Sequence, residues 1–188
     1  MEPMTTIGVN PTPPLDGLPP FDGDELIVVI ETPKGSQNKF AYEPRYGAFV
    51  LKGMLPVGAI FPFDFGMIPS TLGDDGDPLD VLLLMDAPAY PGCIVPSRLI
   101  GVIEAEQTEK GKKERNDRLL AVASNSAVHR STRDVRDLSA DLMHQIEHFF
   151  VSYNEAKGKR FTPKRRSGAA RARRLVEQAH KRKLSADR

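Results

Sequence analysis

Between residues 25 and 124 the apolar positions of the chain fall in short runs that Gly, Pro and Asp interrupt. Runs of this length with such breakers are typical of β-strands, whereas helices need longer segments with a three- and four-residue repeat. No amphipathic helix separates one run from the next, so we expect an antiparallel sheet that is curled or closed. The predicted strands are Glu25–Glu31, Lys39–Glu43, Ala48–Leu51, Leu79–Asp86, Ile94–Glu104 and Arg118–Ser124.

Helical periodicity is found only after residue 137. Behind the cap candidates Asp137 and Ser139, apolar residues recur at steps of three and four until Gly158, which is expected to end the helix. A short strand near residues 160–162 and a second helix over residues 169–183 follow. Strands followed by helices predict an α+β fold, and a small β-barrel is the preferred architecture.

Composition narrows the class of protein. Six of the first 20 residues are proline, which predicts an extended N-terminal arm over residues 1–20 and a single domain over residues 21–188. A chain of 188 residues can bury a core without disulfides, and Cys93 is the only cysteine. The longest apolar run, Val81–Met85, is far shorter than the roughly 20 residues of a membrane span. We therefore expect a cytoplasmic protein that makes no membrane contact.

Charge is distributed unevenly along the chain. Residues 1–156 carry 13 basic and 23 acidic side chains, whereas residues 157–188 carry 13 basic and 2 acidic ones. The acidic body suggests carboxylates gathered for a cation, and the basic C-terminal segment suggests an anionic partner. A solvated helix face is the expected role of that segment. Nucleic acid is an unfavoured partner because only Phe161 could stack on a base, and an acidic protein surface stays open as a third partner.

The chemistry of the chain is concentrated in the segment Asp74–Asp80, which reads D-D-G-D-P-L-D. Four carboxylates within seven residues repel one another unless water solvates them or a hard divalent cation with oxygen ligands neutralises them. Gly76 and Pro78 favour a tight turn that projects the carboxylates into one cavity. A solvated acidic turn is the alternative, because Asp, Gly and Pro are the usual turn residues.

The sequence D-G-D-P-L-D-V at residues 75–81 resembles the signature of the soluble family I inorganic pyrophosphatases. The resemblance extends over about residues 15–180, through further blocks in the family's order at residues 28–33, 38–40, 61–72 and 145–153. It implies a small closed antiparallel OB-like five-stranded β-barrel with helices, a cytoplasmic location and a homohexamer. It also implies Mg²⁺-dependent hydrolysis of inorganic pyrophosphate to two phosphates by a metal-activated water.

The resemblance assigns roles to individual side chains. Pyrophosphate is strongly anionic, so metal ions must screen its charge before a water can attack it, and the same ions make that water more acidic. One carboxylate then takes the proton of the water, and basic or hydroxyl groups hold the phosphates. The implied metal ligands are Asp75, Asp80 and Glu31, the catalytic base is Asp77, and the substrate contacts are Lys39, Tyr153 and Arg118.

The chain also departs from the family's pattern, at seven positions where a polar or charged group is expected. Possible replacements stand beside three of them, namely Lys52, Asp117, Glu104 and Glu106. The alternative function is therefore a weakened or non-catalytic relative that binds metal, phosphate or another phosphoanhydride. The departures are Ala41 for Glu, Gly53 for Arg, Phe61 and Phe65 for Tyr, Gln107 and Asn116 for Asp, and Asn154 for Lys.

The first predicted helix contains a second motif. His144, Glu147 and His148 have the H-x-x-E-H spacing of inverted zinc peptidases. A zinc site needs a further ligand that the sequence does not identify, and the same segment resembles the pyrophosphatase helix. We therefore expect these histidines to be solvated.

Overall fold

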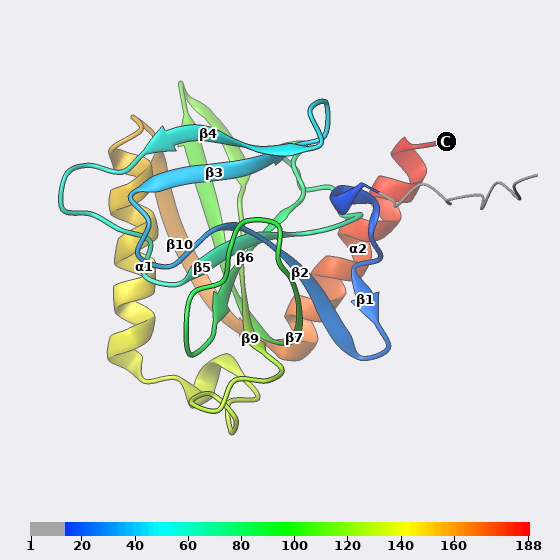
Figure 1. Cartoon of the computed structure of the whole chain (residues 1–188). Coiled ribbons are helices and arrows are strands. Elements are labelled where there is room, and N and C mark those ends of the chain that lie inside the picture. The colour runs from blue at the N-terminus through cyan, green and yellow to red at the C-terminus, as the bar shows by residue number, and fades with distance from the viewer. Residues whose placement is uncertain (1–13) are drawn as a thin grey trace, which may run out of the picture.

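Five strands are joined by pairing into a ring (Figure 1). The computed structural model describes residues 14–188. Neighbouring strands of the ring hydrogen-bond in turn, and the pairing of β7 with β2 returns the ring to its start. In ring order the strands are β2 (Glu25–Thr32), β5 (Asp64–Ile68), β6 (Leu79–Leu84), β9 (Arg118–Ala123) and β7 (Ile94–Glu109).

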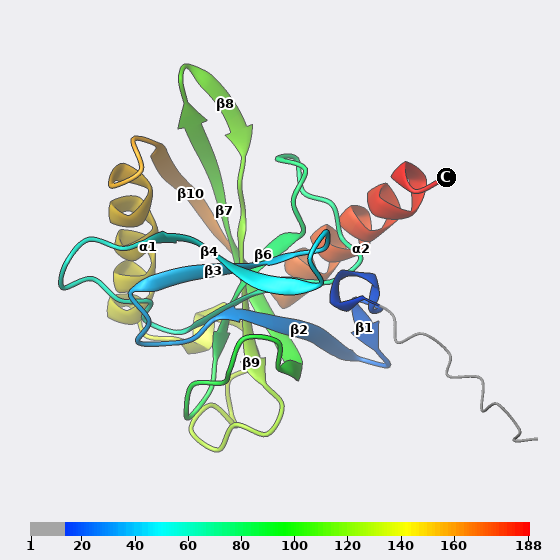
Figure 2. The ribbon, with the colours of Figure 1, turned by 45° about the horizontal axis from the view of Figure 1, so that its top comes forward.

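The remaining elements extend or flank this ring. β1 (Phe21–Asp22) pairs with β2, while β8 (Lys112–Arg115) and β10 (Arg160–Gly168) both pair with β7. The hairpin of β7 and β8 projects away from the ring (Figure 2). A separate two-stranded sheet, two helices and two short 3-10 turns complete the described chain: β3 (Asn38–Glu43), β4 (Ala48–Met54), α1 (Ala140–Glu155), α2 (Ala169–Ala186), η1 (Leu15–Gly17) and η2 (Val135–Asp137).

The chain is mostly sheet with two helices, and each of the seven predicted strands is present; the strand predicted near residues 160–162 is longer than expected and forms β10. One expectation is wrong, and one strand was not predicted. β6 and β9 pair in parallel, with Val81 opposite Leu119, so the sheet is not wholly antiparallel. This pairing is possible without a helical crossover because β7 and β8 form the connection between the two strands. β5 was not predicted as a strand, because it is a short segment beside a cluster of Pro and Gly residues.

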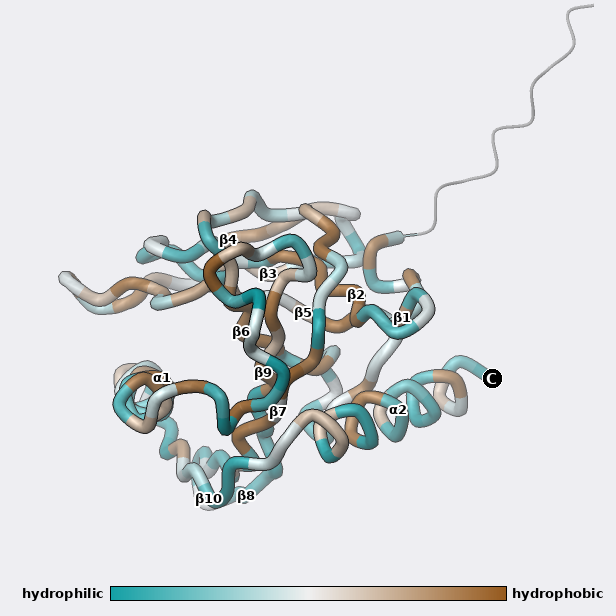
Figure 3. The backbone as a smooth tube through the Cα atoms, turned by 90° about the horizontal axis from the view of Figure 1, so that it is seen from below, coloured by the Kyte–Doolittle hydropathy of each residue, from teal (hydrophilic) through white to brown (hydrophobic). Residues whose placement is uncertain are grey.

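The core is formed by two apolar clusters, one on each side of the sheet. Along β6, Leu82 and Leu84 join a cluster that α1 covers, whereas Val81 and Leu83 join one that α2 covers. This alternation is the two-residue period of a strand that is buried on both faces. Figure 3 shows the apolar strands at the centre and a largely hydrophilic α2 at one side.

Both predicted helices are present. α1 begins after Ser139, whose Oγ accepts a hydrogen bond of 3.1 Å from the Leu142 amide, and it ends before the predicted stop at Gly158. Its inward face carries Met143, Ile146, Phe150 and Tyr153. Neither helix of residues 14–188 is long and apolar enough to span a membrane.

The predicted N-terminal arm is described only from Pro14 onward, since residues 1–13 lie outside the described residues. The Asp16 carbonyl accepts a hydrogen bond of 2.8 Å from the Ser70 amide, and the Pro20 carbonyl accepts one of 3.0 Å from the Ile27 amide. The boundary between arm and domain at residue 20 stays a prediction.

The basic C-terminal segment forms ion pairs with the acidic body of the same chain. Glu104 on β7 pairs with Arg165 at 2.9 Å and Arg171 at 3.1 Å, and it accepts a hydrogen bond of 2.6 Å from the Ser167 hydroxyl. It also pairs with Arg115 of β8 at 2.9 Å. Burial raises the pKa of Glu104, but these hydrogen bonds and charges outweigh burial and lower it to about 2. Part of the positive charge of the basic C-terminal segment therefore forms ion pairs within the chain.

Candidate active site

The acidic segment Asp74–Asp80 is a turn between β5 and β6 that its own backbone holds in shape. The Gly73 amide donates to the Asp77 carbonyl at 2.7 Å, and the Asp77 amide donates to Asp75 Oδ1 at 3.2 Å. Gly76 has φ of 89°, in the left-handed region that favours glycine. At Gly73 a Cβ would stand 2.7 Å from Asp75 Oδ1, so a larger residue there would displace the Asp75 carboxylate. The turn therefore presents its carboxylates in a defined conformation.

Strand register places Asp80 beside Arg118. Val81 and Leu119 are partners in the parallel pair of β6 and β9, and Asp80 and Arg118 each precede one of them. Arg118 Nη1 lies 2.5 Å from Asp80 Oδ2, and the same nitrogen also donates to Asn116 Oδ1. The Arg118 side chain is only 6 % exposed, whereas Asp80 is 24 % exposed, so the ion pair is buried on the arginine side and open on the side of Asp80.

Glu31 is directed into the site by an irregularity in β2. Its register with β5 shifts between Ile30 and Thr32, and such a bulge re-aims the side chain that it contains. Glu31 Oε1 accepts a hydrogen bond of 2.9 Å from the Tyr42 amide of β3. Burial, aided by the nearby charge of Asp80, raises the pKa of Glu31 to about 7 despite this hydrogen bond.

Lys39 of β3 is positioned by two aromatic rings. Its Nζ lies 5.0 Å from the centroid of Phe65 and 5.8 Å from that of Tyr153, both within the range of cation–π attraction. Burial lowers the pKa of Lys39, but the charge of Asp80, followed by Tyr153 and Glu31, raises it above its ordinary value. Lys39 is therefore held as a cation.

Glu31, Lys39, Asp77 and Asp80 line one cavity, which we call the central cavity and which has a volume of about 550 Å³. Arg118 and Tyr153 are not among the residues that line it. Asp75 lines a smaller cavity of about 80 Å³ on the other side of the turn, and Asp80 and Arg118 also line that cavity. Within residues 14–188 no three His, Cys, Asp or Glu side chains are gathered closely enough to hold a metal ion. The charged groups of the central cavity are Asp16, Glu31, Glu43, Asp77, Asp80, Lys39, Lys52, Lys157 and Lys183.

The structure accounts for several departures from the family's pattern. Phe61 is buried in the α1 cluster, and its ring centroid lies 5.7 Å from that of Phe65 and 5.8 Å from that of Tyr153. Asn116 donates to Gln107 at 3.1 Å, so two amides face each other where two carboxylates were expected. At these positions the site has aromatic and amide groups instead of hydroxyls and negative charges.

Of the four possible replacements, only Lys52 lines the central cavity. Asp117 instead accepts a hydrogen bond of 3.0 Å from the Ala105 amide and pairs with Arg115 at 2.7 Å. Glu104 is engaged by the C-terminal arginines, and Glu106 pairs with Lys113 at 2.7 Å. Neighbouring carboxylates therefore do not replace the missing ones in this cavity.

Two lysines of the cavity were missed in the sequence. Lys157 follows Tyr153 by four residues, and its Nζ donates to the Tyr153 hydroxyl. The i, i+4 spacing at the end of a predicted helix was a signal for it, since such residues lie on the same face. Lys183 comes from the far end of α2, and the sequence offered no signal for its approach to the site.

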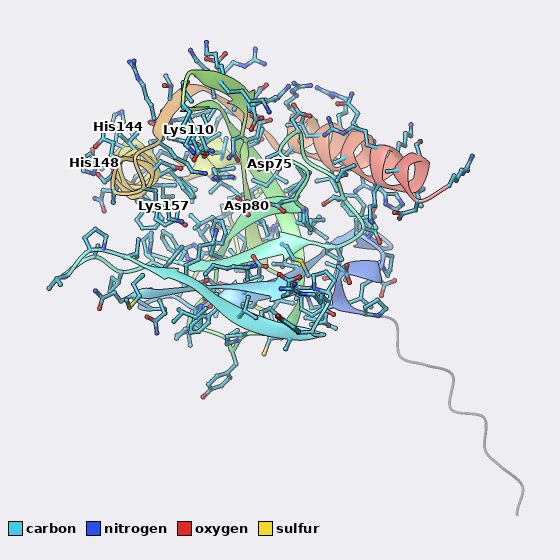
Figure 4. All side chains as sticks on the ribbon, turned by 90° about the horizontal axis from the view of Figure 1, so that it is seen from above. Asp75, Asp80, Lys110, His144, His148 and Lys157 are labelled. Carbon is cyan, nitrogen blue, oxygen red and sulfur yellow. The ribbon has the colours of Figure 1, made fainter. Side chains whose placement is uncertain are left out.

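The H-x-x-E-H motif lies apart from this cavity. Figure 4 shows His144 and His148 on the outer side of α1, away from Asp75 and Asp80. Glu147 pairs with Arg166 of β10 at 2.7 Å, and His148 Nδ1 lies 3.4 Å from the Ser152 hydroxyl. These contacts give the motif a structural role on the helix surface.

Comparison with known proteins agrees with the geometry. Residues 28–184 match the sequence profile of the inorganic pyrophosphatase family. The chain is 35% identical to an inorganic pyrophosphatase of Streptomyces coelicolor over 159 residues, covering 84% of this chain and 95% of that one. It is 36% identical to one of Synechocystis over 134 residues, covering 71% and 77%.

Solved structures give the same result. The crystal structure of the inorganic pyrophosphatase from Thermus thermophilus superposes with a TM-score of 0.83 and 32% identity, covering 92% of this chain and 99% of that one. The inorganic pyrophosphatase of Helicobacter pylori superposes with a TM-score of 0.79 and 31% identity, covering 87% and 95%. Because the family profile matches most of the chain and these relatives share its sequence and fold, this chain belongs to the inorganic pyrophosphatase family.

Proposed function

We propose that this protein hydrolyses inorganic pyrophosphate to two phosphates with the help of Mg²⁺. The observation that carries the proposal is the convergence of Glu31, Asp77 and Asp80 with the cationic Lys39 on one cavity, in a chain of this family. Carboxylates suit a divalent cation, and the lysine suits a phosphate.

The family implies a divalent metal, and the chemistry of the donor set fits one. Glu31 is buried with Asp80 and Asp77 as like charges nearby, so its negative charge is unfavourable until a cation neutralises it. Asp75, Asp80 and Glu31 would hold the metal after moving closer together than they lie among residues 14–188, and hard carboxylate oxygens favour Mg²⁺ over softer ions. When bound, the metal lowers the pKa of water and stabilises the charge that develops on the phosphate.

The protein's own groups divide the remaining work. The Asp77 carboxylate accepts the proton of the attacking water, from the edge of the preformed turn. Lys39 binds phosphate oxygens, and the two rings beside its ammonium fix its position. Tyr153 contacts the phosphate through its hydroxyl, and Arg118 does so while it remains paired with Asp80.

Family membership also supports three proposals about the protein as a whole. The ring of β2, β5, β6, β9 and β7 is an OB-like barrel. The protein assembles as a homohexamer, and it acts in the cytoplasm.

Phosphate release from pyrophosphate, followed against Mg²⁺ concentration, tests the proposed function. Removing a general base costs roughly 10²–10⁴-fold in rate, so Asp77→Asn should lose at least about 100-fold. Asp75→Asn should require more Mg²⁺ for the same rate. Asp141→Asn, in the first turn of α1, is the control and should behave as the natural protein does. Phosphate release no faster than that of Asp77→Asn at any Mg²⁺ concentration would refute the proposal and favour the non-catalytic alternative.

A further inference from the structure

The central cavity holds four lysines, and they differ in how their charge is satisfied. Lys52 pairs with Glu43 at 3.0 Å, and Lys183 pairs with Asp187 at 2.9 Å. Neither Lys39 nor Lys157 takes part in any ion pair formed within residues 14–188. An ammonium without a carboxylate partner keeps its donors for a ligand. Lys39 and Lys157 are therefore the two cations of the cavity that are available to an anion.

Tyr153 brings these two cations to the same place. Lys157 Nζ lies 4.2 Å from the centroid of the Tyr153 ring and donates to its hydroxyl. Lys39 Nζ lies 5.8 Å from the same centroid. Figure 4 shows Lys157 between α1 and the strands, on the side of the helix that faces the site. One tyrosine therefore orients a lysine from β3 and a lysine from the end of α1.

The neighbour of Tyr153 cannot serve in the place of Lys157. Asn154 stands where the family resemblance places a lysine, but its side chain is only 2 % exposed. Its Nδ2 donates to the Phe150 carbonyl at 2.8 Å, so its amide is used to satisfy the helix backbone. Position 154 has a structural role in this chain, and a cation must reach the substrate from another position.

We propose that Lys157 is a substrate-binding residue that contacts a phosphate group of pyrophosphate. The inference rests on the proposed function, because it takes pyrophosphate as the ligand of the cavity. The two unpaired ammonium groups match the two phosphoryl groups of this substrate, and each can donate up to three hydrogen bonds to phosphate oxygens. Lys157 thereby supplies the charge that position 154 lacks.

Four proteins test this inference: the natural protein, Lys157→Gln, Lys157→Arg and the control Lys159→Gln. Lys157 is exposed, so glutamine removes its charge without removing packed atoms. Lys159 is two residues away and pairs with Glu109 at 2.8 Å, outside the cavity. The measurements are KM and kcat for pyrophosphate, and calorimetric affinity for methylenediphosphonate, a diphosphonate that cannot be hydrolysed, both at saturating Mg²⁺.

Hydrogen bonds to charged groups contribute about 1.5–3 kcal/mol, which corresponds to roughly 10- to 150-fold in affinity. We expect Lys157→Gln to raise KM and to weaken diphosphonate binding by at least about tenfold. Lys157→Arg should stay within about threefold of the natural protein because it keeps the charge, and Lys159→Gln should not change either quantity.

The outcomes separate this inference from the proposed function. Hydrolysis by the natural protein with an unchanged diphosphonate affinity in Lys157→Gln would overturn the role of Lys157 and leave the proposed function standing. Diphosphonate binding that depends on Lys157, without hydrolysis by the natural protein, would support the binding role and overturn the activity. Absence of both binding and hydrolysis would overturn both.

Discussion

Glu31 is a buried glutamate and Glu104 a half-buried one, and their conversion to glutamine should have opposite effects on stability. Glu31 is 6 % exposed, and its pKa is raised to about 7 by burial. The pKa of Glu104 is lowered to about 2, because hydrogen bonds from Ser167, Arg171 and Arg165 outweigh its burial. At pH 8 both carboxylates are ionised, which is unfavourable for folding at Glu31 and favourable at Glu104.

The magnitudes follow from these pKa values. For Glu31, the interval between an ordinary value of 4.5 and about 7 corresponds to about 3 kcal/mol of lost stability in the metal-free protein at pH 8. A glutamine keeps the oxygen that accepts from Tyr42 but adds a buried NH₂ group, which costs about 1 kcal/mol or more. We expect Glu31→Gln to be more stable than the natural protein by about 1–2 kcal/mol at pH 8.

The sign of the pH dependence is fixed by the direction of each shift. A carboxyl whose pKa is raised by folding makes the protein less stable as pH rises from the pKa of the unfolded state to that of the folded state, here from 4.5 to about 7. The advantage of Glu31→Gln should therefore fall by about 2 kcal/mol between pH 8 and pH 5. A carboxyl with a lowered pKa keeps its contribution above 4.5 and loses it as pH falls towards about 2.

Glu104→Gln is the matched control for the same chemical change. The shift from 4.5 to about 2 corresponds to about 3 kcal/mol, and water screens the contribution of Arg165, which is 67% exposed. We expect Glu104→Gln to cost about 2 kcal/mol at both pH 5 and pH 8.

Urea unfolding of the three proteins in EDTA, at pH 5 and pH 8, measures both effects. A Glu31→Gln variant less stable than the natural protein at pH 8, or one whose gain is the same at both pH values, would show that Glu31 is not a destabilising buried charge. A Glu104→Gln variant as stable as the natural protein would show that the arginine cluster on Glu104 is solvated and contributes nothing.

Two further predictions concern how the fold positions the site. Gly66→Ala should destabilise the protein by more than about 3 kcal/mol in urea unfolding, because a Cβ there would stand 2.3 Å from the Val29 carbonyl oxygen. The control Gly53→Ala, with no atom within 4 Å of its Cβ, should change stability by less than about 1 kcal/mol. Equal effects of the two substitutions would contradict the argument. Ser139→Ala should lower the free energy of unfolding by about 1 kcal/mol, since it removes the N-cap of the helix that carries Tyr153. Ser139→Asp should retain most of the stability. No loss in the alanine variant would show that the cap is not needed.

Local pattern was enough to predict most of the elements, because each strand and helix carries its own periodicity. It failed where a structure depends on distant parts of the chain. Gly66 looks like a breaker in the sequence, yet it belongs to β5 because only glycine allows β2 to approach so closely. The parallel pairing of β6 with β9 is likewise a property of the ring of strands, which no local run of residues specifies.

For the site, the resemblance names the acidic turn and Lys39, and Asp77, Asp80 and Lys39 do line one cavity, but their roles stay a prediction and their local partners could not be read from the sequence. The pairing of Asp80 with Arg118 follows from strand register, whereas the position of Asp75 at the smaller cavity depends on the conformation of its turn. The role of Asn154 depends on its hydrogen bond to the Phe150 carbonyl, which cannot be predicted from the identity of residue 154 alone. The resemblance places the expected cation directly after Tyr153, whereas Lys157 stands four residues after it.

The charges missing from this site are of both signs, which bears on whether the site has decayed. Three acidic positions of the family hold Ala41, Gln107 and Asn116, while two basic positions hold Gly53 and Asn154. The two amides satisfy each other by a hydrogen bond, so they leave no buried polar group unpaired between them. If Lys157 restores one of the two cations, the site has lost three negative charges and one positive charge. Such a site repels pyrophosphate less before any metal binds. This change in charge is expected of a site that still binds its substrate but needs fewer metal ions to neutralise its own carboxylates.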